Sequence, residues 1–399
     1  MTGSPVSKPG RTDADLADHS RTERRGLTEG RALVLATGWR LQYRTLACAH
    51  PCFAEVHVAG MGSARPLAWS RKCSSFTTIG EEGEPWDEAA VERINDLSRT
   101  LRIDFILPSD ADTVGFVAAF RHRLAAPCFA TPDAESFALL NNKHSFTAFC
   151  QGIGVPTPET KLVANKREML DLLSDGALQF PLVAKPLEMW GSVGVRVFGA
   201  EATARDVEML DYEPVLVQEY VAGSDIAAFY FCRDGQIEAE AVYHFDSTEL
   251  RYIGHDRIRA ESEKIVRVLG ISGVVGFDVR LGAHGRIAYL ECNPRFWYNM
   301  DLTMVAGLNF ISLGVAGKGA AAGLLAGRVV PRPRSLFSGS SAGWRERLAL
   351  GRYLASDVPM VLRLAFHSVL RRVGLFERAA YSTYRKLMRD PKIGAAITD

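Results

Sequence analysis

The order of strand-like and helix-like segments changes along the chain, and this change is the strongest constraint on its fold. Between residues 31 and 132, strand-like runs alternate with helical stretches. Parallel strands need a crossover that is usually a helix, so this alternation predicts a parallel α/β layer. From residue 181 the chain has short strand-like runs with few helices between them. That order predicts a mostly antiparallel α+β domain.

Particular runs of residues supply the expected strands. Those of the N-terminal layer are RALVLATG (31–38), AEVHVAG (54–60), FILPSD (105–110) and PCFATP (127–132), with a helix over 87–104 before the third. Those of the later domain are PLVAKP, GVRVFG, PVLVQEYV, IAAFYFCRDG, QIEAEAVYHF, VVGFDVRL and RIAYLECNP. The first turn of the layer, TGWR, lacks the pattern G-x-G-x-x-G, so no dinucleotide site is predicted there.

Composition and pattern divide the chain into four segments. Residues 1–30 are polar and lack the apolar core of a signal peptide, so we expect a disordered tail. The α/β layer covers residues 31–132. A second domain covers residues 133–330 and opens with a helical stretch over 133–152. Residues 331–399 form a basic helical segment.

The charge is balanced over the whole chain but not along it. The net charge is +1, which argues against a polyanionic partner such as a nucleic acid. Residues 331–399, however, hold 13 Lys+Arg and 5 Asp+Glu. Such a segment suits contact with a membrane surface or another acidic partner, and it equally suits a solvated helical face.

The cysteines are consistent with a reducing compartment. There are seven of them, which is an odd number, and they are scattered without a C-x-x-C pair. They are therefore expected to be buried thiols in the cytosol. The sequence also has no run of 18 apolar residues, so we expect no transmembrane span and a cytoplasmic location.

A pair of strand-like runs, GFDVRLGAHGRIAYLECNPRFW (276–297), carries charge where an apolar face is expected. With a turn over 282–285, residue 278 pairs with 289, and Asp278 and Glu291 become diagonal neighbours roughly 7–8 Å apart. Alternation of side chains then predicts a shared face for five residues: Asp278, Arg280, Tyr289, Glu291 and Asn293.

Two carboxylates and an amide oxygen on one face are the ligands that Mg²⁺ prefers, usually together with the phosphates of a nucleotide. A glycosidase-type acid–base pair is an alternative, although it leaves Asn293 and Arg295 without a role. A salt-bridged or solvent-exposed sheet face is a third reading. The residues alone leave these alternatives open.

Two further stretches suit a nucleotide. Lys185 lies within the apolar run PLVAKP, where its charge calls for an anion, and the following loop contains Gly191, Ser192 and Gly194. The alternative is a β-hairpin whose lysine reaches solvent. In PVLVQEYVAGSD (214–225), the main chain at the strand end can contact an adenine edge and Asp225 a ribose. Its alternative is an ordinary edge strand with an exposed acidic turn.

The order of these features resembles the ATP-grasp superfamily. Lys143 after a helix start, Lys185, GSVGV, QEYVAGSD and D-x12-E-x-N-P-R follow one another as in carboxylate–amine ligases of the carbamoyl-phosphate-synthetase-like branch. The resemblance covers about residues 130–310. It implies a Rossmann-like pre-ATP-grasp domain over 31–132. It further implies an ATP-grasp domain over 133–330, with two α+β subdomains clasping ATP.

The resemblance also implies roles for individual residues. Lys143 and Lys185 would contact the ATP phosphates, and the loop with Gly191, Ser192 and Gly194 would close over them. The adenine would be held by Gln218, Glu219 and Val221, and the ribose by Asp225. The metal ligands would be Asp278, Glu291 and Asn293. Arg295 would stabilise the transferred phosphoryl group, and Arg280 would bind the substrate carboxylate.

The implied activity is ATP-dependent ligation of a small-molecule carboxylate to an amine through an acyl phosphate, with release of ADP and phosphate. The implied cofactor is Mg²⁺, with Mn²⁺ as an alternative, and the default assembly is a homodimer. Carboxyphosphate or carbamoyl-type activation and a non-catalytic ATP-binding module are the alternatives. A further lysine of some relatives is absent here, and the sequence leaves open whether His244 or Arg251 replaces it.

Overall fold

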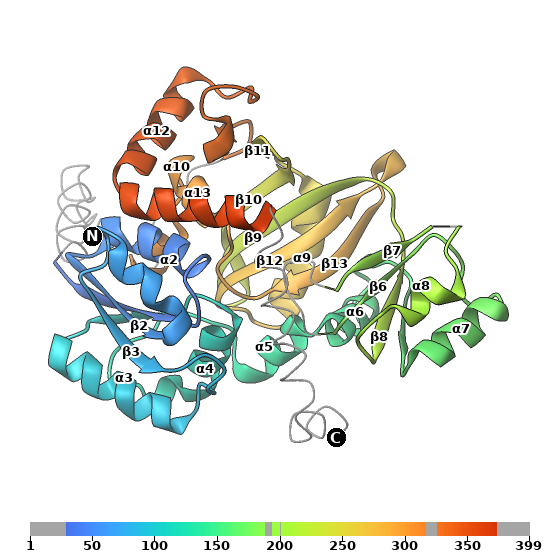
Figure 1. The fold of residues 1–399 in the computed structure, drawn as a ribbon, viewed down its shortest axis with the longest axis horizontal. Helices are drawn as coiled ribbons and strands as arrows, with labels where there is room; N and C mark the ends of the chain where they lie inside the picture. Colours follow the sequence, from blue (N-terminus) through green and yellow to red (C-terminus); the bar gives the residue numbers. More distant parts are fainter. Residues whose placement is uncertain (1–28, 188–193, 200, 317–324, 373–399) are drawn as a thin grey trace, which may run out of the picture.

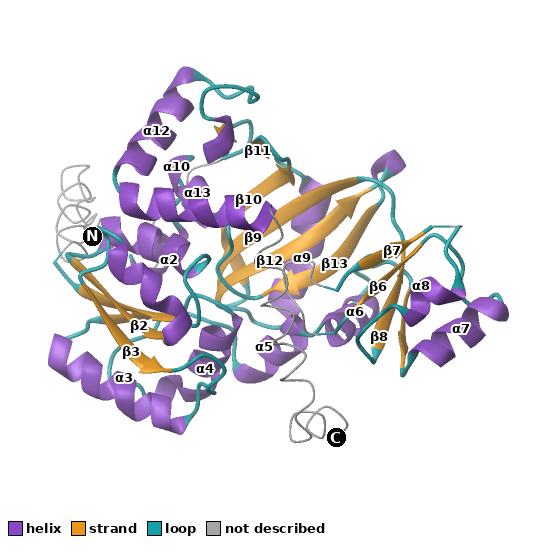
Figure 2. Cartoon of the chain, in the orientation of Figure 1, coloured by secondary structure: helices purple, strands orange, loops and turns teal. Residues whose placement is uncertain are grey.

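The computed structural model describes residues 29–187, 194–199, 201–316 and 325–372. The predicted disordered tail lies almost wholly outside these residues, as do Gly191 and Ser192. The described chain forms three sheets with helices packed around them (Figures 1 and 2). None of the described helices is long and apolar enough to cross a lipid bilayer.

The N-terminal layer is a four-stranded parallel sheet in the order β3-β2-β1-β4, as the strand–helix alternation predicted. Its strands are β1 (Arg31–Ala36), β2 (Glu55–Met61), β3 (Ser75–Gly80) and β4 (Phe105–Leu107), and its helices are α2 (Gln42–Ala49), α3 (Glu88–Leu101) and α4 (Ala111–Phe120). The strand predicted over 127–132 is wrong, because Cys128 makes only an isolated bridge to Ile106.

The helical stretch over 133–152 is divided into α5 (Ala134–Asn141) and α6 (Lys143–Gly152). Asn142 causes the break: its backbone is extended, and its side chain accepts hydrogen bonds from the N–H groups of His144 and Ser145. Such a cap satisfies donors that have no partner within the helix. The break places Lys143 at the first residue of α6.

The small sheet, of order β5-β8-β6-β7, is antiparallel throughout. Its strands are β5 (Thr160–Val163), β6 (Leu182–Lys185), β7 (Arg196–Phe198) and β8 (Val215–Glu219), with helices α7 (Lys166–Ser174) and α8 (Ala204–Glu208). It has its own apolar core, which includes Val163, Met169 and Val215.

The central sheet is antiparallel, in the order β13-β12-β9-β10-β11-β14. Its elements are β9 (Ser224–Arg233), β10 (Gln236–Phe245), β11 (Glu249–Tyr252), α9 (Asp256–Val268), β12 (Gly273–Leu281), β13 (Ile287–Asn293), α10 (Met300–Val305), α11 (Phe310–Val315) and β14 (Val329–Pro331). Separate apolar clusters cover its two faces. The two antiparallel sheets confirm the expected α+β architecture.

The predicted register of β12 and β13 is wrong in two respects. Leu281 pairs with Ile287 rather than 286, and a β-bulge leaves Leu290 without a partner in the register. Together these shifts place Asp278 directly opposite Glu291. Tyr289 leaves the charged face, because it pairs with Val279 and is fully buried against α9.

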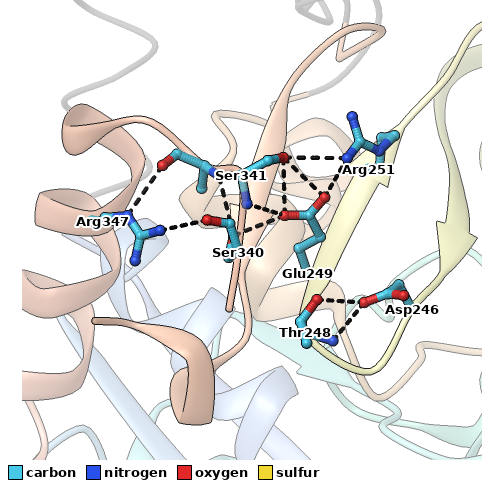
Figure 3. Close-up of polar contacts among 8 residues, drawn as sticks. Asp246, Thr248, Glu249, Arg251, Ser340, Ser341 and Arg347 are labelled. Carbon is cyan, nitrogen blue, oxygen red and sulfur yellow. Dashed lines mark hydrogen bonds and ion pairs between the residues drawn. The ribbon is translucent and has the colours of Figure 1, made fainter. Parts of the chain in front are cut away.

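The C-terminal segment begins within the central sheet as β14 and continues into α12 (Trp344–Ala355) and α13 (Val358–Arg372). Figure 3 shows how Glu249 of β11 anchors it. The buried Glu249 carboxylate accepts hydrogen bonds from the N–H of Ser341 (2.6 Å) and the hydroxyl of Ser340 (2.8 Å), and it pairs with Arg251 (2.5 Å). The described part of this segment, residues 331–372, is therefore packed onto the body of the protein.

Candidate active site

The two predicted carboxylates face each other across neighbouring strands. Asp278 of β12 and Glu291 of β13 are register partners, and each lies close enough to shift the pKa of the other. Burial and the adjacent Glu291 raise the pKa of Asp278 well above its usual value. Burial has the same tendency at Glu291, but Lys143, Asp278 and Lys185 hold its pKa below the usual range. Two such carboxylates are suited to sharing a cation.

Two buried lysines converge on this pair from different elements. Nζ of Lys143, on α6, lies 3.4 Å from Oε2 of Glu291, and the residue is 7% exposed. Lys185 ends β6 of the small sheet and is 8% exposed. Burial lowers its pKa, although Glu291 and Asp278 act against that shift. Helix α6 and strand β6 of the small sheet thus each place an ammonium group beside the carboxylates.

Asn293 and Arg295 continue the charged face past the end of β13. Nη2 of Arg295 donates a hydrogen bond of 2.8 Å to Oδ1 of Asn293. Burial lowers the pKa of Arg295, while Asp110, Glu291 and Asp278 oppose that effect. The guanidinium group is therefore held beside the carboxylates by the side chain of a predicted metal ligand.

The predicted adenine residues lie at the end of β8. Gln218 is buried: its Nε2 donates to Oγ1 of Thr160 (3.1 Å), and its Oε1 has no hydrogen-bond partner among the described residues. Val221 is also buried. The Glu219 carboxylate forms a two-pronged ion pair with Arg286 (2.9 and 2.8 Å), which lowers its pKa. The Glu219 side chain is therefore occupied by Arg286, the residue before β13. This is consistent with the prediction that only the backbone of Glu219 contacts adenine.

Arg280 lies beside the predicted ribose ligand. It is the register partner of Asp225, and its Nη1 lies 3.2 Å from Oδ1 of Asp225 and 3.2 Å from the Gly223 carbonyl oxygen. Among the described residues, no ion pair or hydrogen bond joins Arg280 to Glu291. The structure therefore places Arg280 beside Asp225, the residue predicted to bind the ribose.

Gly194 ends the predicted phosphate loop and is its one described glycine. Its φ of +75° favours glycine, and a Cβ there would come within 3.1 Å of Pro186. Its carbonyl oxygen accepts a hydrogen bond of 2.7 Å from the Tyr212 hydroxyl. These contacts fix the end of the loop next to β6, which carries Lys185.

The N-terminal layer contributes a residue that sequence reasoning missed. Asp110, at the start of α4, accepts hydrogen bonds from Thr37 and Gln42, and its charge opposes the lowering of the Arg295 pKa by burial. The sequence feature that could have revealed Asp110 is the polar end of FILPSD (105–110), because the carboxyl ends of parallel strands commonly carry functional groups. The buried ion pair of Arg44 with Asp301 (2.7 Å) joins the same layer to α10.

Neither candidate for the absent lysine reaches the carboxylates. His244 pairs with Ile226, whose side chain belongs to the cluster on the other face of the sheet from Asp278. Arg251 is held by Glu249 and Ser341 at the C-terminal anchor (Figure 3). The described residues therefore show no substitute for that lysine at either position.

Trp297, just after β13, is a packing residue. Its ring stacks on Phe229 at a centroid distance of 4.2 Å. Gly276 makes room for this arrangement, because a Cβ there would lie 2.0 Å from the Phe229 ring. Trp297 and Phe229 thus form an apolar contact next to the end of β13.

The donor set fits a magnesium ion shared with phosphate, but not a site built from protein ligands alone. The described residues contain no group of three or more His, Cys, Asp or Glu side chains that could hold a metal. Mg²⁺ commonly binds one or two carboxylates and takes its other ligands from water and nucleotide phosphates. Asp278 and Glu291 supply that number of carboxylates.

No protein-family model matches the chain. The large chain of carbamoyl phosphate synthase from Thermus thermophilus is 25% identical over 195 residues, covering 43% of this chain. The chain spans 18% of the length of that relative.

Solved structures match a larger share of the chain than this relative does. N5-carboxyaminoimidazole synthetase from Staphylococcus aureus, complexed with ADP, has a TM-score of 0.59 at 12% identity and covers 75% of this chain and 81% of its own. L-amino acid ligase from Bacillus licheniformis has a TM-score of 0.54 at 16% identity and covers 72% and 74%. The chain therefore has the ATP-grasp fold, preceded by a Rossmann-like layer, as the motif order predicted.

Proposed function

We propose that the protein is an ATP-dependent carboxylate–amine ligase. The observation that supports this most directly is the meeting of Lys143, Lys185 and Arg295 around Asp278 and Glu291. Three cations around a carboxylate pair form a site for a metal-bound polyphosphate. The neighbours named above, a synthetase complexed with ADP and an amino acid ligase, support the same class of reaction.

Each residue group has a task in this reaction. Gln218 and the backbone around Val221 hold the adenine, and Asp225, oriented by Arg280, holds the ribose. Lys143 and Lys185 neutralise the phosphates of ATP. Arg295 stabilises charge on the phosphoryl group as it passes to a substrate carboxylate. These steps depend on position and charge more than on proton transfer.

Asp278, Glu291 and Asn293 would hold Mg²⁺, which when bound neutralises charge on the β- and γ-phosphates. Mn²⁺ has a similar preference for oxygen ligands and is the alternative ion. The substrate carboxylate becomes an acyl phosphate, an amine then displaces phosphate, and an amide forms. The homodimer and the cytoplasmic location remain predictions of the sequence.

A second candidate replaces the organic acid with bicarbonate, giving carboxyphosphate. The likeness to carbamoyl phosphate synthase and to a carboxyaminoimidazole synthetase favours this alternative. Both candidates use the same nucleotide and metal residues. They differ only in which acid receives the phosphoryl group.

Release of ADP and phosphate over pairs of acids and amines, with and without bicarbonate, tests the proposal. A ligase requires both an acid and an amine for full turnover. Dependence on bicarbonate without any organic acid would select the second candidate. Nucleotide binding that no acid–amine pair and no bicarbonate converts to hydrolysis would overturn both candidates and favour a binding module.

A further inference from the structure

Helix α13 turns a row of large apolar side chains toward solvent. Val358, Leu362, Phe366 and Val369 are 43%, 64%, 64% and 55% exposed. Their spacing of four, four and three residues places them on one face of the helix. This set, called the α13 stripe below, is continuous over the helix. Apolar residues scattered singly on a surface are ordinary, but a continuous row marks a contact site.

The opposite face of α13 is already packed against the protein. Met360 is fully buried, and the Arg363 guanidinium lies 5.7 Å from the Trp39 ring and 5.3 Å from the Trp69 ring. Asp357, just before the helix, accepts hydrogen bonds from Ser70 (2.5 Å) and the Arg71 N–H (3.2 Å). Helix α13, labelled in Figure 1, is therefore fixed on the N-terminal layer, while the side chains of the stripe remain exposed.

The charges of this region are those that favour an anionic surface. Residues 358–372 contain three arginines and one histidine but no acidic residue, and residues 331–399 hold 13 Lys+Arg against 5 Asp+Glu. Trp69, which is 68% exposed, shares the guanidinium of Arg363 on the same helix with Trp39. Apolar side chains with tryptophan and arginine beside them are typical of helices that lie in a membrane interface.

We propose that the α13 stripe docks this protein onto the surface of a bilayer rich in anionic phospholipid. The helix would lie in the plane of the interface, with Leu362 and Phe366 inserted among the lipids. Attraction between the arginines of residues 331–372 and lipid headgroups would add to the apolar contact. This docking is independent of the ligase reaction proposed above.

The size of the stripe favours lipid over a second copy of the chain. A stable protein–protein interface takes roughly 20–30 residues from each partner. The stripe offers four large apolar side chains, and direct stacking of two copies would bring two basic helices together. Binding to a membrane interface needs no matching surface and grows with the apolar area inserted and the anionic charge available.

Flotation of the full-length protein with vesicles tests the proposal. The probe is a set of vesicles with phosphatidylglycerol and phosphatidylcholine in equal parts, compared with phosphatidylcholine alone. We expect the protein to float with the mixed vesicles at low salt, less with the neutral ones, and less at high salt. The double variant Leu362→Glu/Phe366→Glu should lower the partition coefficient by about tenfold or more, because two inserted apolar groups are lost.

A matched control separates the stripe from a general change in charge. Leu162→Glu/Met209→Glu adds the same charge at two exposed apolar residues of the small-sheet region, and this variant should float like the wild type. Equal binding of both double variants, or no flotation of the wild type, would overturn the proposal. So would sedimentation showing that Leu362→Glu/Phe366→Glu abolishes a dimer while lipid binding is absent.

Discussion

Nζ of Lys143 lies 3.4 Å from Oε2 of Glu291, and Asp278 lies directly across from the same glutamate. Glu291 therefore lies between the ammonium group of Lys143, which is on α6, and the carboxyl group of Asp278, which is on β12. The lysine lowers the pKa of Glu291, while burial and Glu291 raise that of Asp278. The surroundings therefore favour the ionised form of Glu291 and oppose ionisation of Asp278.

The first prediction concerns Glu291→Gln, which keeps the volume but removes the charge. If Glu291 binds the metal as proposed, turnover measured as ADP release should fall by at least about 100-fold, because a metal ligand is lost. The fold should persist, as circular dichroism would show. Glu82→Gln, at an exposed position, is the control and should keep full activity. Full activity in Glu291→Gln would remove this residue from the metal site.

Asp278→Asn should stabilise the protein while abolishing turnover. The raised pKa of Asp278 means that the folded state resists its ionisation. The cost is absent below the unfolded pKa of about 3.9 and grows as pH rises above it. In metal-free buffer at neutral pH the variant should gain about 0.5–2 kcal/mol in unfolding free energy, seen as a higher Tm. The gain should shrink toward pH 4, and a gain independent of pH would contradict this account.

The sheet types were predictable from the sequence because they depend on the order of elements. Four strands were missed. Three of them, Ser75–Gly80, Thr160–Val163 and Val329–Pro331, lie at sheet edges, and the fourth, Glu249–Tyr252, is short and lies next to the edge strand β14. Edge strands are often short and carry polar residues, so their hydrophobic period is weak. The strand predicted for PCFATP (127–132) is the opposite kind of error. Its composition is typical of a strand, but only Cys128 pairs with a neighbouring residue, Ile106.

The convergence of Asp278 and Glu291 was predictable from alternation, but their direct opposition was not. It depends on the bulge at Leu290 and on a longer turn, and neither has a periodic signal. The approach of Lys143 depends on the break at Asn142 and on packing between α6 and β13. Contacts across elements of this kind depend on tertiary packing, which no single stretch of sequence encodes.

Lys185→Met should weaken ATP binding by about tenfold or more, because a buried cation facing the phosphates is replaced by an apolar chain of similar length. Burial lowers the pKa of Lys185, so its charge is lost at a lower pH than that of an ordinary lysine. Affinity for ATP in the wild type should therefore fall as pH rises, and the variant should lose this dependence. Calorimetric titration at several pH values measures both effects. Unchanged affinity in Lys185→Met would remove it from the phosphate site.

Glu249→Ala should loosen the C-terminal anchor without altering nucleotide affinity. It would leave the Ser341 N–H and the Ser340 hydroxyl without their acceptor (Figure 3). Loss of such partners costs about 1–3 kcal/mol. Although burial opposes ionisation, these donors lower the pKa of Glu249, so its stabilisation is complete above the unfolded pKa and disappears as pH falls through the folded one. Thermal unfolding of both proteins between pH 3 and 7, roughly the range set by ordinary glutamate titration, should converge at the acid end.

The last prediction decides the role of Arg280, which the sequence assigned to the substrate carboxylate and the structure pairs with Asp225. If Arg280 orients the ribose ligand, Arg280→Ala and Asp225→Ala should each raise the KM for ATP, by about three- to tenfold, and leave the KM for the acid unchanged. The double variant should be little worse than either single one, because both remove the same contact. A selective rise in the KM for the acid, with effects of the two variants simply adding, would return Arg280 to the substrate side.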